Sequence, residues 1–294
     1  MNAAKPSMND TIAFRPIRLA DREALLSIAA QIWEGHDYLP LVFERWVREE
    51  GSYFAGLLFN GRLAGCGRLH PFDARIAWCE GLRVDPEYQR HGLGAHLARH
   101  VVAYARDRGL RELMFVTYFA NRGSMRISER LGFRRSATFT NFEAKDLSAS
   151  AAWARSIDRA AVHIEEGLPG MPGFAVNDWF FVPPEVADRG RYLPGARTLR
   201  DGKQALVVAP NTKYPHSLEI GWFDAIEGRV SEPCLAAAIL LARDEGFSQM
   251  HAMAPAGTLP EPFLQAGFAW QEAPDDVYLY RGRIAELSLE ASNS

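Results

Sequence analysis

The sequence lacks the features that would place the protein in a membrane, on nucleic acid or in an oxidising compartment. No apolar run approaches the roughly 18–20 residues that a membrane helix needs, and the formal net charge of the 294 residues is only −3. The three cysteines are Cys66, Cys79 and Cys234, which are too few and too far apart for a disulfide framework. We therefore expect a cytoplasmic protein that binds neither a membrane nor nucleic acid.

Two common phosphate-binding patterns and a metal pattern are also missing. The chain has no Gly-Lys-Ser/Thr of a Walker loop, and a dinucleotide fingerprint that starts at Gly92 would need glycine where the chain has Leu97. His96 and His100 have helical spacing, but no third ligand and no His-Glu-x-x-His pattern accompany them. We therefore expect no bound metal, and a solvated helix face explains the two histidines.

The apolar pattern predicts a mixed α/β chain in the first half. Helices are predicted over 21–33, 40–50, 91–108 and 121–130, and strands over 52–59, 62–70, 74–84, 112–119 and from 131 onward. Asn60-Gly61 between the first two strands is typical of a hairpin turn. The strand–helix–strand order over 74–119 implies one parallel crossover within a mixed sheet.

The second half repeats part of the first. Residues 242–268 and 105–133 share the order Ala-Arg-Asp-x-Gly, strand, loop, short helix and Gly-Phe. We favour a duplication of the fold over chance similarity, although the second copy lacks a glycine loop before its helix. An Ala/Ser-rich and then Gly/Pro-rich stretch predicts a linker. The expected domains are therefore 11–145, a linker over 146–170, and 171–285.

The segment Gln89–Gly94 places two glycines at the mouth of the helix predicted over 91–108. A helix start leaves about four N–H groups unpaired and carries roughly half a positive charge, so anions bind there. Glycine has no Cβ, so a phosphate can approach the backbone closely. On the loop alone, a tight turn without a ligand is an equally good interpretation.

Three elements, of which this loop is one, make the region resemble the GCN5-related N-acetyltransferases (GNAT). They occur in the family's order and at its spacing: Val84-Asp85-Pro86, then Gln89-x-x-Gly92-x-Gly94, then Asn121-x-x-Ser124 with Leu131-Gly132-Phe133. The resemblance covers about residues 11–145. It implies a mixed α/β GNAT fold followed by a second, degenerate GNAT-like domain, and the ligand-free turn becomes the weaker interpretation.

The resemblance implies acetyl-CoA as co-substrate and a set of residues that hold it. The loop backbone would bind the pyrophosphate, and the strand edge would pair with the pantetheine arm. A later asparagine would contact the pantetheine or the region near the thioester sulfur, and a serine three residues on would also belong to the cofactor site. These residues are Leu82, Arg83, Val84, Gln89, Arg90, His91, Gly92, Leu93, Gly94, Asn121 and Ser124.

Glu80 is the candidate base that removes a proton from the attacking amine. Strand periodicity would place Glu80 on one face with Leu82 and Val84; an ion pair with Arg68 or Arg83 is the alternative role. The family's usual proton-donating tyrosine is Ser128 in this chain. Ser128 through water, Tyr118, or no acid at all remain open.

The acceptor would lie against the loop between the first two helices, which groups Trp33, His36, Asp37 and Tyr38. Asp37 is expected to pair with a cationic acceptor, although an ordinary surface loop is the alternative. A weaker similarity to histidine N-acetyltransferases suggests the amine of a free amino acid. Protein N-termini or lysines are alternative acceptors, a non-catalytic acyl-CoA sensor is an alternative function, and we expect a monomer or homodimer.

Overall fold

The computed structural model describes residues 10–32 and 35–289. The chain forms two compact units, and each is considered by itself. Residues up to 136 together with 280 onward make the first unit, and residues 137–279 make the second. Within the described residues, no helix has the length and hydropathy needed to cross a bilayer, and no group of three metal-binding side chains is found.

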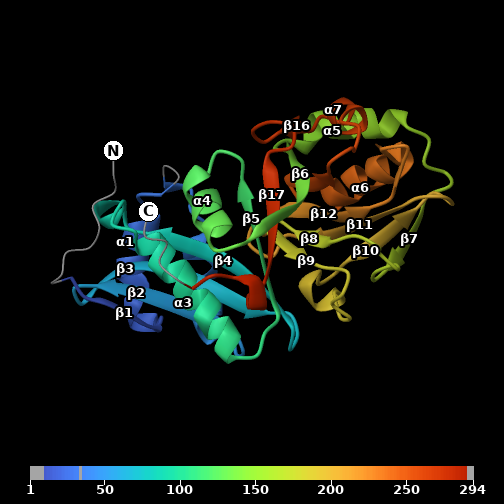
Figure 1. Ribbon diagram of the computed structural model, residues 1–294. Helices are drawn as coiled ribbons and strands as arrows, with labels where there is room; N and C mark the ends of the chain where they lie inside the picture. The colour runs from blue at the N-terminus through green and yellow to red at the C-terminus, as the bar shows by residue number, and fades with distance from the viewer. Residues whose placement is uncertain (1–9, 33–34, 290–294) are drawn as a thin grey trace. The chain divides into compact units, whose positions relative to one another are not determined.

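The first unit is a mixed sheet with helices on both faces (Figure 1). Its sheet order is β1-β2-β3-β4-β5-β17, and β4 and β5 run parallel. Its elements are β1 (Ile12–Pro16), α1 (Arg22–Ala29), α2 (Leu39–Arg48), β2 (Tyr53–Phe59), β3 (Arg62–Pro71), β4 (Ile76–Val84), α3 (Leu93–Asp107), β5 (Glu112–Tyr118), α4 (Arg122–Arg130) and the end of β17 (Val277–Arg283).

Alternation along β3 shows which helices cover which face of this sheet. Cys66 belongs to a buried cluster with residues of α1 and α2, such as Leu25 and Phe43. A Cβ on the next residue, Gly67, would lie 3.6 Å from Leu97 of α3. Because successive strand residues point to opposite faces, α1 and α2 cover one face and α3 covers the other.

The second unit has its own sheet, in the order β6-β15-β12-β11-β10-β7, with β16 beside β6. Its elements are β6 (Arg134–Ala144), α5 (Leu147–Ser156), β7 (His163–Glu166), β8 (Ala175–Asn177), β9 (Phe180–Val182), β10 (Arg197–Arg200), β11 (Ala205–Pro210), β12 (Ser217–Phe223), β13 (Ala225–Ile226), β14 (Arg229–Val230), α6 (Glu232–Asp244), β15 (Gln249–Pro255), α7 (Glu261–Gln265) and β16 (Ala269–Trp270). The core packs α5 and α6 against β6, β12 and β15.

The repeat seen in the sequence has a structural counterpart. In each unit a strand is followed by a helix and then by a strand parallel to the first: β4–α3–β5 and β12–α6–β15. Both helices end before a glycine with positive φ, Gly109 (74°) and Gly246 (83°), which avoids the Cβ penalty of that conformation. The predicted hairpin turn at Asn60-Gly61 is confirmed, with both residues at positive φ.

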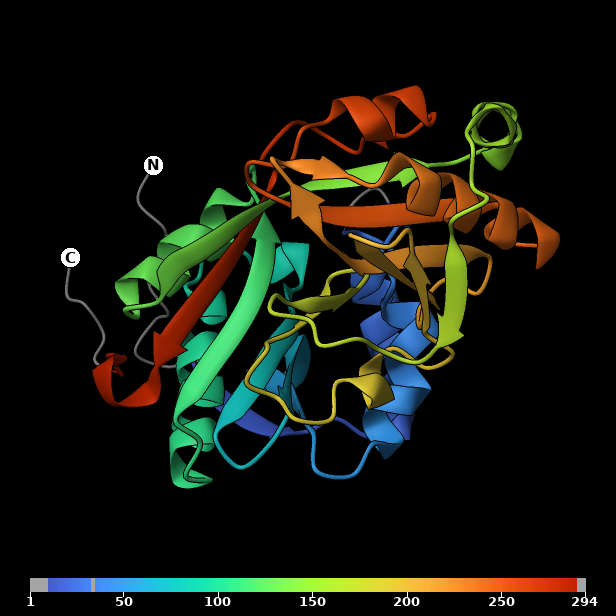
Figure 2. The ribbon, with the colours of Figure 1, turned by 90° about the vertical axis from the view of Figure 1, so that its right-hand side faces the viewer.

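The end of the chain belongs to the first unit. The last part of β17, red in Figures 1 and 2, runs beside β5. Arg106 of α3 donates to the carbonyls of Ile284 (3.1 Å) and Leu287 (3.0 Å). The unit boundaries thus differ from the expected ranges 11–145 and 171–285 because strand pairing, which is nonlocal, recruits residues 280 onward into the first unit and residues 137–145 into the second. The expected linker over 146–170 is wrong, because α5 packs into the core of the second unit and β7 pairs with β10.

Candidate active site

The strands β4 and β5 separate part of the way along the sheet. They pair at Ile76–Glu112, Ala77–Leu113 and Trp78–Met114, and beyond these residues the two strands continue without pairing with each other. The other edge of β4 stays paired with β3 as far as Val84. The split therefore leaves one edge of β4, after Trp78, where an extended ligand could pair like an added strand.

Helix α3 starts beside the end of β4 without a side-chain cap. Its N-cap is Gly92, with φ of 75°, and Arg90 also has positive φ (68°). Gln89, Arg90 and Gly92 are exposed, and His91 holds the loop through Nδ1, which lies 3.1 Å from the Gln89 carbonyl. In the first turn, the N–H of Ala95 donates to the Gly92 carbonyl (3.0 Å). The N–H groups of Leu93 and Gly94 point out of the helix start with no capping side chain.

The glycine positions fit a pyrophosphate group. An ideal Cβ on Gly92 would meet no atom within 4 Å, so the space in front of the helix is open. A Cβ on Gly94 would lie 3.2 Å from Ile127 of α4 and 3.8 Å from Val84 of β4, which brings the first turn close to both elements. An anion at this helix start would meet unpaired N–H donors and the positive end of the helix dipole.

The corresponding helix of the second unit has a different start. The N-cap of α6 is Ser231, whose Oγ accepts from the N–H of Cys234 (3.2 Å). The hairpin β13–β14 precedes it, and the Gly228 carbonyl accepts from the N–H of Leu259 (2.8 Å), in the loop after β15. A side chain and a backbone hydrogen bond therefore occupy the region equivalent to the glycine loop of the first unit.

A β-bulge corrects one expectation about Glu80. Along β3, Cys66 pairs with Arg83 and Arg68 pairs with Glu80, so β4 contains one extra residue between these pairs. The extra residue is accommodated at Gly81, which has φ of 69°. Strand periodicity is interrupted, and the expectation that Glu80 shares a face with Leu82 and Val84 is wrong. Glu80 and Arg83 share the face of α1 and α2.

Glu80 forms an ion pair with Arg68, whose guanidinium also contacts Glu49. The side chains of Arg68 and Glu80 are only 4% and 7% exposed. This pairing is the role that we considered as the alternative to catalysis. It contacts only the Oε1 atom of Glu80, so a role as base stays a prediction.

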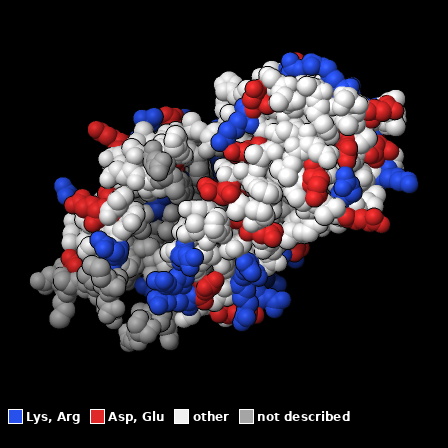
Figure 3. Space-filling view, turned by 90° about the horizontal axis from the view of Figure 1, so that it is seen from above, with Lys and Arg blue, Asp and Glu red and all other residues white. Residues whose placement is uncertain are grey.

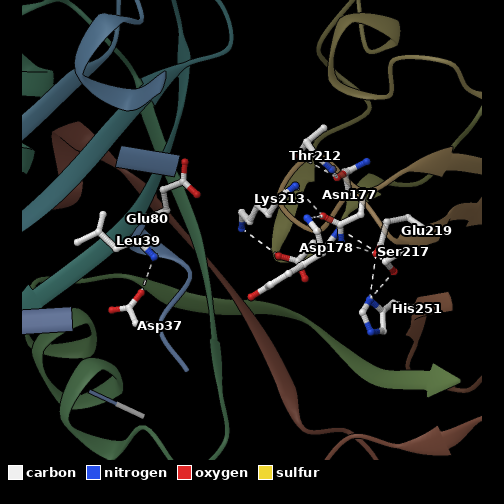
Figure 4. Close-up of polar contacts among 12 residues, drawn as sticks. Asp37, Leu39, Glu80, Asn177, Asp178, Thr212, Lys213, Ser217, Glu219 and His251 are labelled. Atoms are coloured by element: carbon white, nitrogen blue, oxygen red, sulfur yellow. Dashed lines mark hydrogen bonds and ion pairs between the residues drawn. The ribbon is translucent and has the colours of Figure 1, made fainter. Parts of the chain in front are cut away.

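A buried ion pair holds the predicted acceptor loop in place. Arg83 donates to both carboxylate oxygens of Asp37, and each side chain is 1% exposed. Asp37 Oδ1 also accepts from the N–H of Leu39 (2.8 Å), as Figure 4 shows. Asp37 is therefore occupied by Arg83, contrary to the expected pairing with a cationic acceptor. His36 is exposed, and Trp33 lies outside the described residues.

The remaining predicted residues cluster at α4. Asn121 caps the helix by accepting from the N–H of Ser124 (3.2 Å). Ser128 is buried at 8% exposure, which reduces its access to solvent for a water-mediated proton transfer. Tyr118 is half-buried at the end of β5, and its carbonyl accepts from the N–H of Asn121. These contacts bring Tyr118, Asn121 and Ser124 together at the end of β5.

Sequence reasoning missed Glu49 altogether, along with the connecting role of Trp46. The guanidinium of Arg68 lies 4.9 Å from the centre of the Trp46 ring. Glu49 directly follows α2, and nothing in its local pattern distinguishes it from a solvated helix end. The sequence did carry one signal for this packing, Gly81, because a glycine inside a strand pattern often marks a bulge or a close approach of another group.

A second polar cluster lies wholly within the second unit (Figure 4). Buried Glu219 accepts from Asn211 Nδ2 (2.6 Å) and from the N–H of Asp178 (3.2 Å), and its Oε1 lies 3.1 Å from His251 Nδ1. Lys213 Nζ lies 3.0 Å from Asp178 Oδ2. The cluster thereby joins the β8–β9 turn to β12 and β15 through buried charges.

Stability of the second unit should depend on pH through His251. Burial alone lowers the pKa of His251, but the hydrogen bond to Glu219 and the surrounding carboxylates outweigh it, so the pKa lies above the ordinary 6.5. A raised folded-state pKa gives stability that is fully present below pH 6.5 and is lost as pH rises through the folded pKa. Urea unfolding of the wild type should therefore show the free energy of unfolding falling as the pH rises above 6.5, and His251→Asn should flatten this dependence. If the free energy of unfolding depended on pH equally in the two proteins, His251 would not have this role.

Comparisons with known proteins agree with this arrangement. Residues 21–133 match the model of the acetyltransferase (GNAT) family. A mycothiol acetyltransferase from Salinispora tropica is 31% identical over 153 residues, covering 47% of this chain and 50% of that protein. The chain thus spans half the length of this curated relative.

Two solved structures share the fold over most of the chain. A GCN5-related N-acetyltransferase from Sphaerobacter thermophilus matches with a TM-score of 0.64, 13% identity, and coverage of 93% of this chain and 96% of that one. A tandem GNAT protein from the clavulanic acid biosynthesis pathway matches with a TM-score of 0.57, 16% identity, and coverage of 93% and 99%.

The fold is therefore the mixed α/β fold of the tandem GNAT proteins. Within the first unit, residues 21–133 are similar to the acetyltransferase (GNAT) family. The expected fold class is confirmed.

Proposed function

We propose that the protein is an acetyl-CoA-dependent N-acetyltransferase that acetylates the primary amine of a small molecule, with a free amino acid as the first candidate. The observation that carries this proposal is the uncapped, glycine-led start of α3 beside the split of β4 and β5. The family uses acetyl-CoA generally. The similarity to a mycothiol acetyltransferase, a relative named for a small molecule, supports a small acceptor.

Acetyl-CoA, when bound, supplies an acetyl thioester that an amine can attack. The N–H groups at Gly92, Leu93 and Gly94 would hold its pyrophosphate, and the edge of β4 after Trp78 would hold the extended arm. Glu80 takes a proton from the attacking amine, directly or through water, because an alkylamine is largely protonated at neutral pH. The leaving thiolate needs no dedicated acid, since a thiol pKa of about 8.5 allows it to leave as the anion.

The acceptor class is tested by following free CoA release in the presence of acetyl-CoA and a panel of amines. The panel contains the twenty amino acids, spermidine, an aminoglycoside and peptides with free N-termini or lysines. The face of the molecule in Figure 3 carries both basic and acidic side chains, so the panel includes acceptors of either charge. We expect strong release with one small amine. Release with peptides alone would indicate a protein acceptor, and binding without release would indicate a sensor.

The loop itself is tested by Gly92→Asp. Aspartate tolerates positive φ, and its carboxylate would enter the open space at the helix start, bond to the first-turn N–H groups and repel phosphate. Acetyl-CoA affinity should fall about 100-fold, which corresponds to about 2.7 kcal/mol. Isothermal titration calorimetry measures this change.

The matched control is Gly109→Asp, at the other end of the same helix. Gly109 has φ of 74°, and a Cβ there would also meet no atom within 4 Å. Acetyl-CoA affinity should be unchanged in this variant. Equal losses in the two variants would show that backbone strain, and not the phosphate site, causes the effect.

A further inference from the structure

Helix α2 is fastened at both ends to the strand that carries Glu80, and we propose that these two clamps position the acceptor amine against Glu80. The N-terminal clamp is the pair Asp37–Arg83. The C-terminal clamp is the group Glu49–Arg68–Glu80. The inference rests on the function proposed above, because it gives α2 and the loop before it the role of acceptor wall.

The N-terminal clamp ties the first residue of α2 to β4. Arg83 Nη2 donates to Asp37 Oδ1 at 2.5 Å, and Arg83 Nε donates to Oδ2. Asp37 Oδ1 also accepts from the N–H of Leu39, where α2 begins. Both charged side chains are 1% exposed, so neither has water as an alternative partner. Removal of one member would leave the other charge buried, which is strongly unfavourable.

The C-terminal clamp ties the end of α2 to Glu80 itself. Glu49 directly follows the last residue of α2 and contacts Arg68 Nη2, while Arg68 Nη1 contacts Glu80. Arg68 is 4% exposed and Glu49 is 32% exposed. One guanidinium therefore holds both the end of the helix and the candidate base, with His70 Nδ1 3.0 Å from Arg68 Nη2.

The space between the two clamps is filled by Trp46. A Cβ on Gly81 would lie 2.8 Å from Trp46 and 2.9 Å from Arg83, so only glycine lets the bulge pack here. The Trp46 ring contacts the Arg68 guanidinium and packs nearly perpendicular to the Tyr38 ring, with the two ring centres 5.9 Å apart. The guanidinium of Arg83 lies 4.7 Å from the Tyr38 ring. The clamps thus form one continuous set of contacts from Leu39 to Glu80.

Arg68 and Arg83 are therefore positioning residues that act through α2 and Glu80. The two clamps should have separable effects. Loss of the N-terminal clamp releases the wall against which the acceptor binds, and this raises KM for the amine. Loss of Glu49 loosens the hold on Glu80 and on the end of α2 together, and this lowers kcat.

The experiment compares full-length wild type, Asp37→Asn and Glu49→Gln by three measurements. Hydrogen exchange is followed over residues 35–50, acetyl-CoA binding by calorimetry, and turnover with L-histidine and with a hexapeptide that begins with alanine. We expect exchange to rise about tenfold at the start of α2 in Asp37→Asn and at its end in Glu49→Gln. KM for the amine should rise about tenfold in the first variant, and kcat should fall about tenfold in the second. Acetyl-CoA affinity should stay unchanged in both.

Glu44→Gln is the control, because Glu44 and Arg48 form an exposed pair on the same helix, and it should match the wild type. If hydrogen exchange over residues 35–50 were as slow in both clamp variants as in the wild type, the clamps would not hold α2 and the proposal would be wrong. Faster exchange with unchanged kinetics would overturn their role in positioning. If Asp37→Asn does not fold, the exchange and kinetic results for Glu49→Gln alone decide whether the clamps position the acceptor. A wild type that turns over neither acceptor counts against the proposed function, while the exchange data still decide whether the clamps exist.

Discussion

Glu80→Gln should lower kcat/KM about 100-fold or more, because a positioned general base typically contributes 10²–10⁴-fold. Glutamine keeps the size of the side chain, and its amide oxygen still accepts a hydrogen bond from Arg68, so the ion-pair group should stay assembled around Glu49. It cannot take a proton from the amine. Acetyl-CoA affinity should therefore be unchanged while the pH dependence of the rate changes shape.

The measurement is kcat/KM as a function of pH for the wild type and Glu80→Gln, with Glu44→Gln as an exposed carboxylate control. An unchanged pH–rate profile in Glu80→Gln would remove Glu80 from the mechanism. The ion pair with Arg68 would then be its whole role.

Tyr280→Ala should destabilise the first unit by about 3–5 kcal/mol, the usual range for deletion of a large buried aromatic side chain. Tyr280 is 2% exposed, its ring stacks on Phe115 with centres 5.1 Å apart, and its hydroxyl donates to Glu129 (2.9 Å). These contacts join the end of the chain to β5 and α4, the elements beside the glycine loop. Acetyl-CoA binding should weaken in parallel.

Urea unfolding combined with limited proteolysis shows which of the two units unfolds in Tyr280→Ala. Tyr280→Phe is the matched control and should cost about 1 kcal/mol, since it removes only the hydrogen bond to Glu129. Arg283→Ala, at a side chain that is 78% exposed, should have no effect. A free energy of unfolding of Tyr280→Ala equal to that of the wild type would show that the contacts of β17 do not stabilise the first unit.

Features encoded in short segments could be predicted from the sequence. The turn at Asn60-Gly61 and the helix start at Gly92 depend on residues within a few positions, and positive φ at each explains why glycine or asparagine occurs there. The parallel strand–helix–strand unit follows from apolar periodicity and is observed as β4–α3–β5.

Features that depend on distant partners could not be predicted. The bulge at Gly81 changes the face of Glu80, and only its pairing with β3 reveals the shift in register. Asp37 meets Arg83 across 46 positions of sequence, so its carboxylate looked available to a ligand. The return of β17 to the first unit depends on strand pairing between residues that are still further apart.

Titration of the full-length chain with acetyl-CoA tests the central claim most directly. The uncapped start of α3 predicts one equivalent bound per chain, because Ser231 caps the corresponding helix of the second unit. The affinity of this binding should fall about 100-fold in Gly92→Asp and stay unchanged in Gly109→Asp. Two equivalents per chain, or undiminished binding in Gly92→Asp, would contradict a single acetyl-CoA site at the glycine loop.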